Sequence, residues 1–413
     1  MSDIESLNNI HVTAMNVKEI TEGVYYAGVN DRVTALFEGL WPIPEGVSYN
    51  SYIVKGENAT ALIDTVRIDE VREFLSNISR IQDGRPIDYL VINHMEPDHS
   101  GSIPEVVRAY PDIKIVGNVQ TIGMIKGFYH IFDDSRFMEV KDGEVLDLGG
   151  KTLKFYLTPM VHWPETMMTY LEENGTLFSG DAFGTFGALN GAVTDCEMET
   201  DRYFPEMYRY YANIVGKYGM FVQRALACLA GVDIKWICST HGPVWHSRIA
   251  EVVDLVDRLS RYESEPGVVI VYGSMYGNTA EMAEEVARGL AEAGVTNIIM
   301  HDASHSSMSR MISDAYRYEG LVVGCATYSM RLFPPVETFM NAMETREIKN
   351  KVFAAFGSFT WAKGAVGAKM DEYAARMGLD SVGYVVMKQT LDDDSRAAAR
   401  RLGSDVAARL TCK

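Results

Sequence analysis

The sequence has few cysteines, and none of them form a pattern typical of metal binding or of a disulfide framework. Five cysteines occur in 413 residues; they are scattered and odd in number, and no two of them form a Cys-x-x-Cys pair. This excludes a local cysteine-ligated metal knuckle and gives no sign of paired disulfides. We expect reduced and mostly buried thiols at Cys196, Cys228, Cys238, Cys325 and Cys412.

Long apolar runs and an excess of positive charge are also missing. No stretch of 18 apolar residues occurs, so we expect no membrane-spanning helix. The opening residues, Met1 to Ser6, are acidic and polar and lack the basic and apolar regions of a secretory signal, which predicts a cytoplasmic protein. The net charge of −18 argues against nucleic acid as a main partner, because binding phosphates needs a basic surface.

The composition is that of a globular protein with two domains. Hydrophobic residues make up 47% and charged residues 23% of a chain that is too long for one ordinary domain. A polar run ending in Pro-Gly, Glu263 to Gly267, is a boundary signal. It predicts one domain at residues 1–262 and another at 267–413.

The two halves have different rhythms of predicted elements. In the first half, short strands alternate with helical stretches, and a helix at 247–262 closes it. We expect strands at 24–28, 51–54, 61–64 and 152–157 and helices at 69–78 and 104–109. In the second half, five strand–helix units predict a doubly wound parallel sheet of the α/β class. Its strands are expected at 268–272, 297–300, 321–324, 351–356 and 382–386, with helices from 279–293 to 392–410.

Metal-ligand residue types are concentrated in one short segment of the first half. His94-Met95-Glu96-Pro97-Asp98-His99 directly follows an apolar run and precedes a Ser-Gly turn. His162, Asp181 and His241 each lie in a loop with small neighbours after a predicted strand. Ligands at the ends of several strands can converge on one rigid site. Seven ligands are too many for one tetrahedral ion and predict two metals of higher coordination.

Mixed imidazole and carboxylate ligation points to iron, with open positions for a small molecule. Asp181 is the natural bridging ligand, because it stands alone between two histidine-bearing loops. His99 is the least constrained of the set, since it could turn away and leave a water in its place. The other histidines are interpreted as ordinary core or surface residues: His11, His130, His246, His301 and His305.

A glycine-containing loop, Gly273 to Thr279, lies between the first strand and first helix of the second half. Small residues and backbone N–H groups at a helix N-terminus form an anion site, here for a phosphate. The loop is neither a Walker A motif nor a dinucleotide G-x-G-x-x-G; it resembles the phosphate loop of flavodoxins. In such folds, loops after later strands hold the flavin ring. The expected flavin contacts are Ser274, Met275, Tyr276, Gly277, Asn278, Thr279, Ala326, Thr327, Tyr328, Ser358, Phe359, Thr360, Trp361 and Gly364.

The first half resembles the metallo-β-lactamase fold, an αββα sandwich, with Glu96 where the family's second loop histidine stands. From about Lys18 to Leu410 the chain is similar to the flavodiiron proteins, which join this fold to a flavodoxin-like domain. The resemblance implies FMN and two non-haem iron ions as cofactors. It assigns His94, Glu96 and His162 to one iron and Asp98, His99 and His241 to the other, with Asp181 bridging them.

The family reduces O2 to water or NO to N2O. The chain looks most like the F420H2 oxidases of methanogenic archaea, which implies reduced F420 as the donor and oxygen detoxification as the role. The resemblance also implies a head-to-tail homodimer, alone or within a tetramer, in which one chain's FMN faces the partner's irons. Arg331 and Lys363 are candidates to receive the acidic tail of F420. Tyr25, Tyr26 and Trp163 either line the oxygen pocket or are core aromatics.

Three alternatives remain at this point. The same scaffold could serve chiefly as an NO reductase with rubredoxin or another donor. It could be a zinc hydrolase with a flavodoxin-like regulatory domain, although an anionic ligand at Glu96 favours a harder, more highly charged ion than zinc. It could also be a non-enzymatic electron carrier, which would leave the seven-ligand site unexplained.

Overall fold

The computed structural model describes residues 18–411. The chain forms two compact units. The first contains residues up to Phe37, Ile43–Met207 and Phe221–Asp254, and the second contains Glu38–Pro42, Tyr208–Met220 and the chain from Leu255 onwards. Two short segments of the first half of the sequence therefore belong to the second unit. The domain ranges 1–262 and 267–413 stay predictions.

The first unit contains two mixed sheets. The seven-stranded sheet has the order β1-β2-β7-β8-β9-β10-β11, antiparallel up to β8 and parallel from β8 to β11. The five-stranded sheet runs β12-β13-β14-β15-β16, with only the last pair parallel. The strands are β1 (Lys18–Thr21), β2 (Val24–Tyr26), β7 (Tyr52–Lys55), β8 (Thr60–Ile63), β9 (Tyr89–Val91), β10 (Lys114–Gly117), β11 (Phe137–Glu139), β12 (Val145–Asp147), β13 (Thr152–Leu157), β14 (Met167–Leu171), β15 (Thr176–Gly180) and β16 (Trp236–Ser239).

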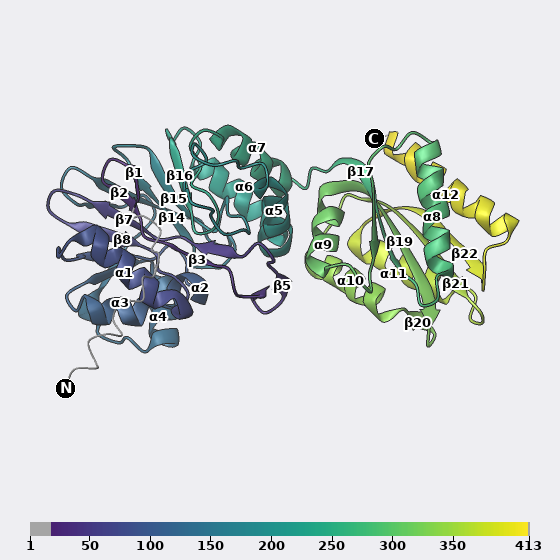
Figure 1. Cartoon of the computed structure of the whole chain (residues 1–413), viewed down its shortest axis with the longest axis horizontal. Coiled ribbons are helices and arrows are strands. Elements are labelled where there is room, and N and C mark those ends of the chain that lie inside the picture. Colours follow the sequence, from purple (N-terminus) through teal and green to yellow (C-terminus); the bar gives the residue numbers. More distant parts are fainter. Residues whose placement is uncertain (1–17, 412–413) are drawn as a thin grey trace, which may run out of the picture. The chain divides into compact units, whose positions relative to one another are not determined.

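Within residues 18–262, four short strands and seven α-helices complete the first half of the sequence. Strand β3 (Val29–Asp31) pairs with β6 (Val47–Tyr49); β4 is Leu36–Phe37 and β5 is Trp41–Pro42. The helices are α1 (Val71–Gln82), α2 (Pro97–Ser100), α3 (Ile103–Ala109), α4 (Val119–Tyr129), α5 (Tyr203–Tyr210), α6 (Gly219–Cys228) and α7 (Ile249–Ser260). Figure 1 shows α1, α3 and α4 on the side of the seven-stranded sheet and α6 on the side of the five-stranded sheet.

Burial patterns explain why the two sheets form a sandwich. Every residue of β8, β14 and β15 is buried, as expected for strands covered on both faces. Tyr52 of β7 packs against Phe178 of β15, with ring centroids 5.4 Å apart, so side chains of the two sheets meet in a common core. Helix α1 buries Phe74, Ile78 and Ile81 at helical spacing and presents its polar face to solvent. The predicted αββα sandwich is confirmed.

The second unit is a parallel sheet between two layers of helices. The strand order is β18-β17-β19-β21-β22, in which chain order 2-1-3-4-5 is that of flavodoxin-like folds. All four pairings are parallel, and the short β20 (Arg331–Leu332) adds an antiparallel hairpin to β19. The strands are β17 (Glu265–Gly273), β18 (Ile298–Asp302), β19 (Tyr318–Tyr328), β21 (Val352–Phe359) and β22 (Asp380–Lys388). The predicted doubly wound sheet is confirmed.

Five helices cover this sheet. Figure 1 shows α8 (Asn278–Glu292) and α12 (Asp393–Thr411) side by side on one face. The opposite face carries α9 (Met308–Arg317), α10 (Pro334–Thr345) and α11 (Ala365–Met377). The buried cluster beneath α8 and α12 joins Val286 and Leu290 to Val406 and to sheet residues such as Phe356. Because the helices cover the two faces of the sheet, the loops that follow the strands lie at its carboxyl edge.

Two details differ from the sequence interpretation. Strand β17 begins at Glu265, within the boundary run Glu263 to Gly267 and before the expected start at Val268, and its pairing register shifts between Glu265 and Val268. A Cβ at Gly267 would lie 2.7 Å from the ring of Tyr318, so glycine allows a tight bulge at the start of this strand.

The thiols are also less buried than expected. Cys238 and Cys325 are buried, but Cys196 and Cys228 are exposed, and all four are free. Cys412 lies outside the described residues. Among residues 18–411, no helix is long and apolar enough to cross a membrane.

Candidate metal centre and flavin pocket

Loops at the carboxyl ends of four strands carry the predicted metal ligands. The first loop leaves β9 and turns into the short helix α2, which Pro97 opens at its first position. The other loops follow β13, β15 and β16. Because both sheets direct these strand ends to the same edge of the sandwich, all seven residues meet there: His94, Glu96, Asp98, His99, His162, Asp181 and His241.

The seven side chains form two clusters rather than one. His94, Glu96, His162 and Asp181 each offer a ligand atom within 4.8 Å of the others, and Asp98, His99 and His241 do the same. Both clusters are largely buried. These groupings correspond to the two iron sites that the sequence resemblance implies, and the assignment of each ligand to an ion remains a proposal.

Asp181 lies between the clusters and points one oxygen at each. Its Oδ2 lies 3.1 Å from Nε2 of His162 and 3.5 Å from Nε2 of His94. Its Oδ1 lies 3.1 Å from Nε2 of His99 and 3.9 Å from Nε2 of His241. A carboxylate in this orientation can bridge two ions.

The ligand atoms of the second cluster lie close together. Nε2 of His99 and Nε2 of His241 face each other at 3.0 Å, and both lie within 3.3 Å of Oδ2 of Asp98. Both carboxylate oxygens of Asp98 are nevertheless buried without a hydrogen-bond partner among the described residues. Buried lone pairs aimed at a common centre need a cation. The residues therefore fit two metal ions, and three carboxylates with four imidazoles are a donor set suited to iron.

The electrostatics of the cluster favour positive charge. Burial alone would lower the pKa of the His99 imidazole, but the carboxylates of Asp98 and Asp181 outweigh it and raise the pKa to about 9. The pKa of His162 is also raised to about 9, because hydrogen bonds to Asp181 and Glu96 outweigh its burial. Metal ions replace such protons when they bind, since ligation needs the imidazole lone pair.

Two buried carboxylates behind the ligands were not found from the sequence. Oε1 of Glu165 lies 2.9 Å from Nδ1 of His94 and accepts a 2.8 Å hydrogen bond from the backbone N–H of Met95. Oδ1 of Asp64 accepts hydrogen bonds from the backbone N–H groups of Asn93 (2.7 Å) and His94 (3.3 Å). Asp64 and Glu165 therefore both contact the loop that contains His94. A signal was present, because Glu165 follows His162 within three residues and Asp64 ends an apolar strand.

The three candidate aromatics have different surroundings. Trp163 packs edge-on against the ring of His94, with centroids 5.4 Å apart, and so covers one side of the first cluster. Tyr26 is buried and donates a 2.9 Å hydrogen bond to Oδ1 of Asn50. Tyr25 lies beneath the ammonium group of Lys55, 4.8 Å from its ring centroid. Only Trp163 of these three has a ring contact with a predicted ligand among the described interactions.

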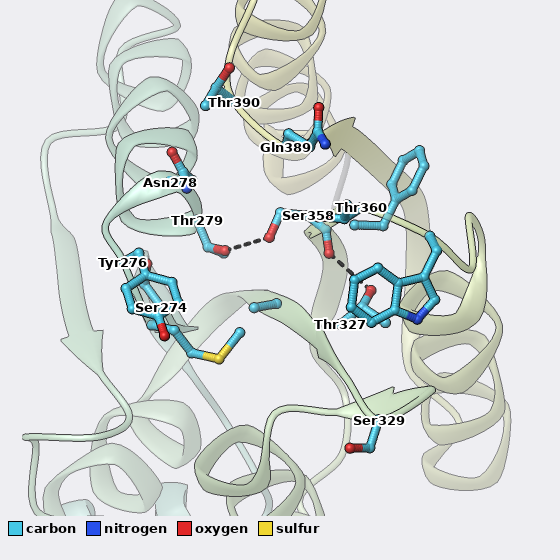
Figure 2. Close-up of a pocket in the computed structure, with 14 residues that line it drawn as sticks. Ser274, Tyr276, Asn278, Thr279, Thr327, Ser329, Ser358, Thr360, Gln389 and Thr390 are labelled. Carbon is cyan, nitrogen blue, oxygen red and sulfur yellow. Dashed lines mark hydrogen bonds between the residues drawn. The ribbon is translucent and has the colours of Figure 1, made fainter.

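In the second unit, the loops after the strands enclose a cavity of about 310 Å³ (Figure 2). It contains residues from the predicted phosphate loop and from both predicted ring loops. The lining residues are Ser274, Met275, Tyr276, Asn278, Thr279, Ala326, Thr327, Ser329, Ser358, Phe359, Thr360, Trp361, Gln389 and Thr390.

Hydroxyl groups tie the loops of this cavity together. Figure 2 shows Thr279 and Ser358 pointing toward each other, and their hydroxyl oxygens lie 2.9 Å apart. Thr327 donates a 2.9 Å hydrogen bond to the carbonyl of Ser358. Gly277, in the left-handed conformation at φ 94°, opens helix α8 and donates to Oγ of Ser274 at 3.1 Å. The cavity thus offers a helix N-terminus and several hydroxyls, which fit a phosphate and a polar chain.

The cavity differs in part from the predicted contact set. Gly277, Tyr328 and Gly364 are not among its lining residues; the ring of Tyr328 packs against Phe333 instead, with centroids 6.0 Å apart. Gly364 opens α11 in the left-handed conformation, as Gly277 does for α8. Ser329, Gln389 and Thr390 line the cavity without having been predicted. The signal for the last two was their position directly after the fifth strand.

Comparisons with known proteins agree with both halves. Residues 47–242 match the family described as ODP family beta lactamase, and residues 270–401 match the flavodoxin family. The chain is 32% identical to an anaerobic nitric oxide reductase flavorubredoxin of Escherichia coli, covering 94% of this chain and 81% of that protein. It is 33% identical to an uncharacterised protein of Methanocaldococcus jannaschii, covering 89% and 91%.

Solved structures show the same two-part architecture. The rubredoxin oxygen:oxidoreductase of Desulfovibrio gigas superimposes with a TM-score of 0.91 at 28% identity, covering 96% of this chain and 99% of that one. The flavodiiron protein of Giardia intestinalis gives a TM-score of 0.91 at 27% identity, covering 96% and 97%.

A metallo-β-lactamase-like sandwich with a two-cluster ligand set, joined to a flavodoxin-like domain, defines a class of two-domain flavoprotein oxidoreductases. The chain belongs to the flavodiiron protein family. Membership implies FMN and a non-haem di-iron centre as its cofactors, and the residues present fit both.

Proposed function

We propose that this protein reduces O2 to water at a non-haem di-iron centre and receives the electrons through FMN from reduced F420. Its role would then be oxygen detoxification in the cytoplasm. The observation that carries the proposal is the position of Asp181, with one carboxylate oxygen toward each histidine cluster. A bridge of this kind suits two cooperating ions, and Glu96 in the first cluster favours iron over zinc.

The seven predicted ligands would form two metal positions. The first ion would be held by His94, Glu96 and His162 and the second by Asp98, His99 and His241, with Asp181 common to both. When bound, two ferrous ions and a reduced flavin together hold the four electrons that reduction of O2 to two waters consumes. Trp163 excludes water from one side of the first cluster through its edge contact with His94.

The flavin would occupy the cavity of the second unit. Helix α8 and the hydroxyls of Ser274 and Thr279 would bind the phosphate. Trp361, with 71% of its surface exposed, lies at the rim of the cavity, where it could cover the flavin ring.

Positively charged side chains are the candidates to bind the proposed donor, reduced F420. F420 has an acidic tail, and Lys363 is exposed beside Trp361. Arg331 already pairs with Glu337 at 2.6 Å, so Lys363 is the better candidate to receive the tail. A Lys363→Glu variant should raise the KM for reduced F420 and leave the KM for O2 unchanged. Equal KM values for F420 in the variant and the parent protein would remove Lys363 from the donor site.

We also propose a head-to-tail homodimer, alone or within a tetramer, in which each FMN serves the irons of the partner. Mixing two variants, one impaired in its iron centre and one impaired in FMN binding, tests it. Asp181→Ala lacks the bridging ligand, and a variant with both Thr279→Val and Ser358→Ala weakens the FMN cavity. Mixed dimers should recover part of the activity, because one functional iron centre then faces one functional FMN. Absence of recovery in demonstrated mixed dimers would contradict the arrangement.

A second candidate function is reduction of NO to N2O. It is favoured by the 32% identity to a protein of Escherichia coli named as an anaerobic nitric oxide reductase.

The electron donor also has an alternative, because the similar protein of Desulfovibrio gigas is named a rubredoxin oxygen:oxidoreductase. Steady-state O2 uptake with reduced F420, NADH and reduced rubredoxin, each tested separately, decides the donor. Metal analysis that finds two zinc ions and no iron would overturn the oxidoreductase proposal itself.

A further inference from the structure

Three of the four histidines in the two clusters, His94, His99 and His241, differ in what their Nδ1 atom contacts. Nδ1 of His94 lies 2.9 Å from the carboxylate of Glu165, whereas Nδ1 of His241 lies 2.8 Å from the backbone carbonyl of Ser48. Nδ1 of His99 is buried and has no hydrogen-bond partner in the part of the chain that the structure describes. The first cluster therefore has anionic support behind a ligand, and the second has a neutral acceptor and an unsupported imidazole.

Glu165 is firmly held in this position. Its side chain has no exposed surface, and the backbone N–H of Met95 donates to the same Oε1 that faces His94. Its other oxygen, Oε2, is buried without a hydrogen-bond partner among residues 18–411. The backbone N–H of Met95 and Nδ1 of His94 thus both contact one oxygen of a buried carboxylate, and its charge acts on His94 at close range.

A carboxylate in this place has two effects on the ligand. It keeps the proton on Nδ1, so that the lone pair of Nε2 faces the cluster, and it makes the imidazole a stronger donor. A backbone carbonyl, as at His241, fixes the ring but adds no charge. An imidazole with no acceptor at Nδ1, as at His99, gains neither effect.

We propose that Glu165 is a positioning residue that makes the two metal positions unequal, so that the His94–Glu96–His162 position binds its ion more tightly than the Asp98–His99–His241 position. The inference rests on the proposed metal centre and goes beyond it by ranking its two halves. On this ranking, the Asp98–His99–His241 position loses its ion first.

Titration of the full-length, metal-free protein with Co²⁺ under anaerobic conditions tests this ranking. Calorimetry and the visible spectrum of bound Co²⁺ report each ion independently of activity. The parent protein should bind two ions with two distinct affinities. Glu165→Gln keeps an oxygen acceptor but removes the charge, and it should weaken the tighter ion by roughly 10–100-fold while the weaker ion keeps its affinity. The exposed Glu172→Gln, which removes the same charge on the surface, should change neither.

Two results would overturn the inference: unchanged affinity of the tighter ion in a folded Glu165→Gln variant, or loss confined to the weaker ion. If that variant does not fold, His99→Ala decides, because it should lose the weaker ion and keep the tighter one with its spectrum unchanged. Loss of the tighter ion in His99→Ala would reverse the ranking. Failure of the parent protein to bind two ions would instead count against the proposed function.

Discussion

Thr240 donates a 2.5 Å hydrogen bond to Oδ1 of Asp181, the oxygen that faces the second histidine cluster. Thr240 directly precedes His241, so one loop supplies both a proposed ligand and the group that orients the proposed bridging carboxylate. The hydrogen bond fixes the rotation of the carboxylate and leaves Oδ2 facing His162 at 3.1 Å. A neutral side chain therefore orients the carboxylate that lies between the two clusters.

Replacing Thr240 with valine keeps the shape of the side chain and removes this hydrogen bond. Iron content should fall below two ions per chain, with metal affinity about 10–100-fold lower, as is common when a group that orients a ligand is lost. Iron analysis after dialysis measures it. Thr176→Val is the matched control, because that hydroxyl contacts Asn174 at the other end of strand β15. Full iron content in Thr240→Val would show that Asp181 needs no such support.

The facing hydroxyls of Thr279 and Ser358 join two loops of the flavin cavity. Removing both, as Thr279→Val with Ser358→Ala, should weaken FMN binding about fivefold to tenfold, the effect of losing roughly one net hydrogen bond. Fluorescence quenching of FMN on titration with the flavin-free protein gives the Kd. The exposed Thr338, whose hydroxyl bonds only within helix α10, provides a Thr→Val control. An unchanged Kd would place the phosphate elsewhere.

Helices α8 and α12 pack closely against each other at Gly289. A Cβ at Gly289 would lie 2.0 Å from the carbonyl oxygen of Arg400, too close for the helices to keep their spacing. Gly289→Ala should therefore destabilise the second unit by about 1–3 kcal/mol, measured by urea unfolding. The same change at Gly127 in α4, where no atom lies within 4 Å, should stabilise the first unit by roughly 0.5–1 kcal/mol. Equal effects of the two changes would contradict the close crossing.

The same helix pair contains a buried carboxylate. Burial raises the pKa of Glu285, but hydrogen bonds from Arg400 and Arg396 outweigh it and hold the pKa below its ordinary value. A lowered pKa in the folded state adds stability above the ordinary glutamate pKa of about 4.3, and that stability is lost as pH falls through the folded value. The difference in urea midpoint between the parent protein and Glu285→Gln should thus be constant from pH 8 to pH 5 and shrink on further acidification. If the difference in urea midpoint grew on acidification, the pKa of Glu285 would be raised in the folded protein and not lowered.

The sequence predicted the ligand set because each of those residues is unusual where it stands. A histidine or aspartate at the end of an apolar strand, such as Asp181, can be recognised from the sequence alone. Glu165 was missed because its role depends on the chain folding back until it faces His94. Gln389 was missed for a related reason, since only the strand order brings the loop after β22 to the flavin cavity. Strand β17 was expected only from Val268 although it begins at Glu265, because a proline near the start of a strand also fits a turn.

Consumption of O2 and NO by one preparation loaded with iron and FMN tests the proposed activity most directly. With reduced F420 as donor, the protein should consume O2 with about two donor molecules oxidised per O2, because each donor supplies two electrons and water formation needs four. Asp181→Ala should abolish this turnover. The account would be contradicted if the loaded protein consumed NO but no O2, or if the Asp181→Ala variant without iron turned over O2 as fast as the parent protein.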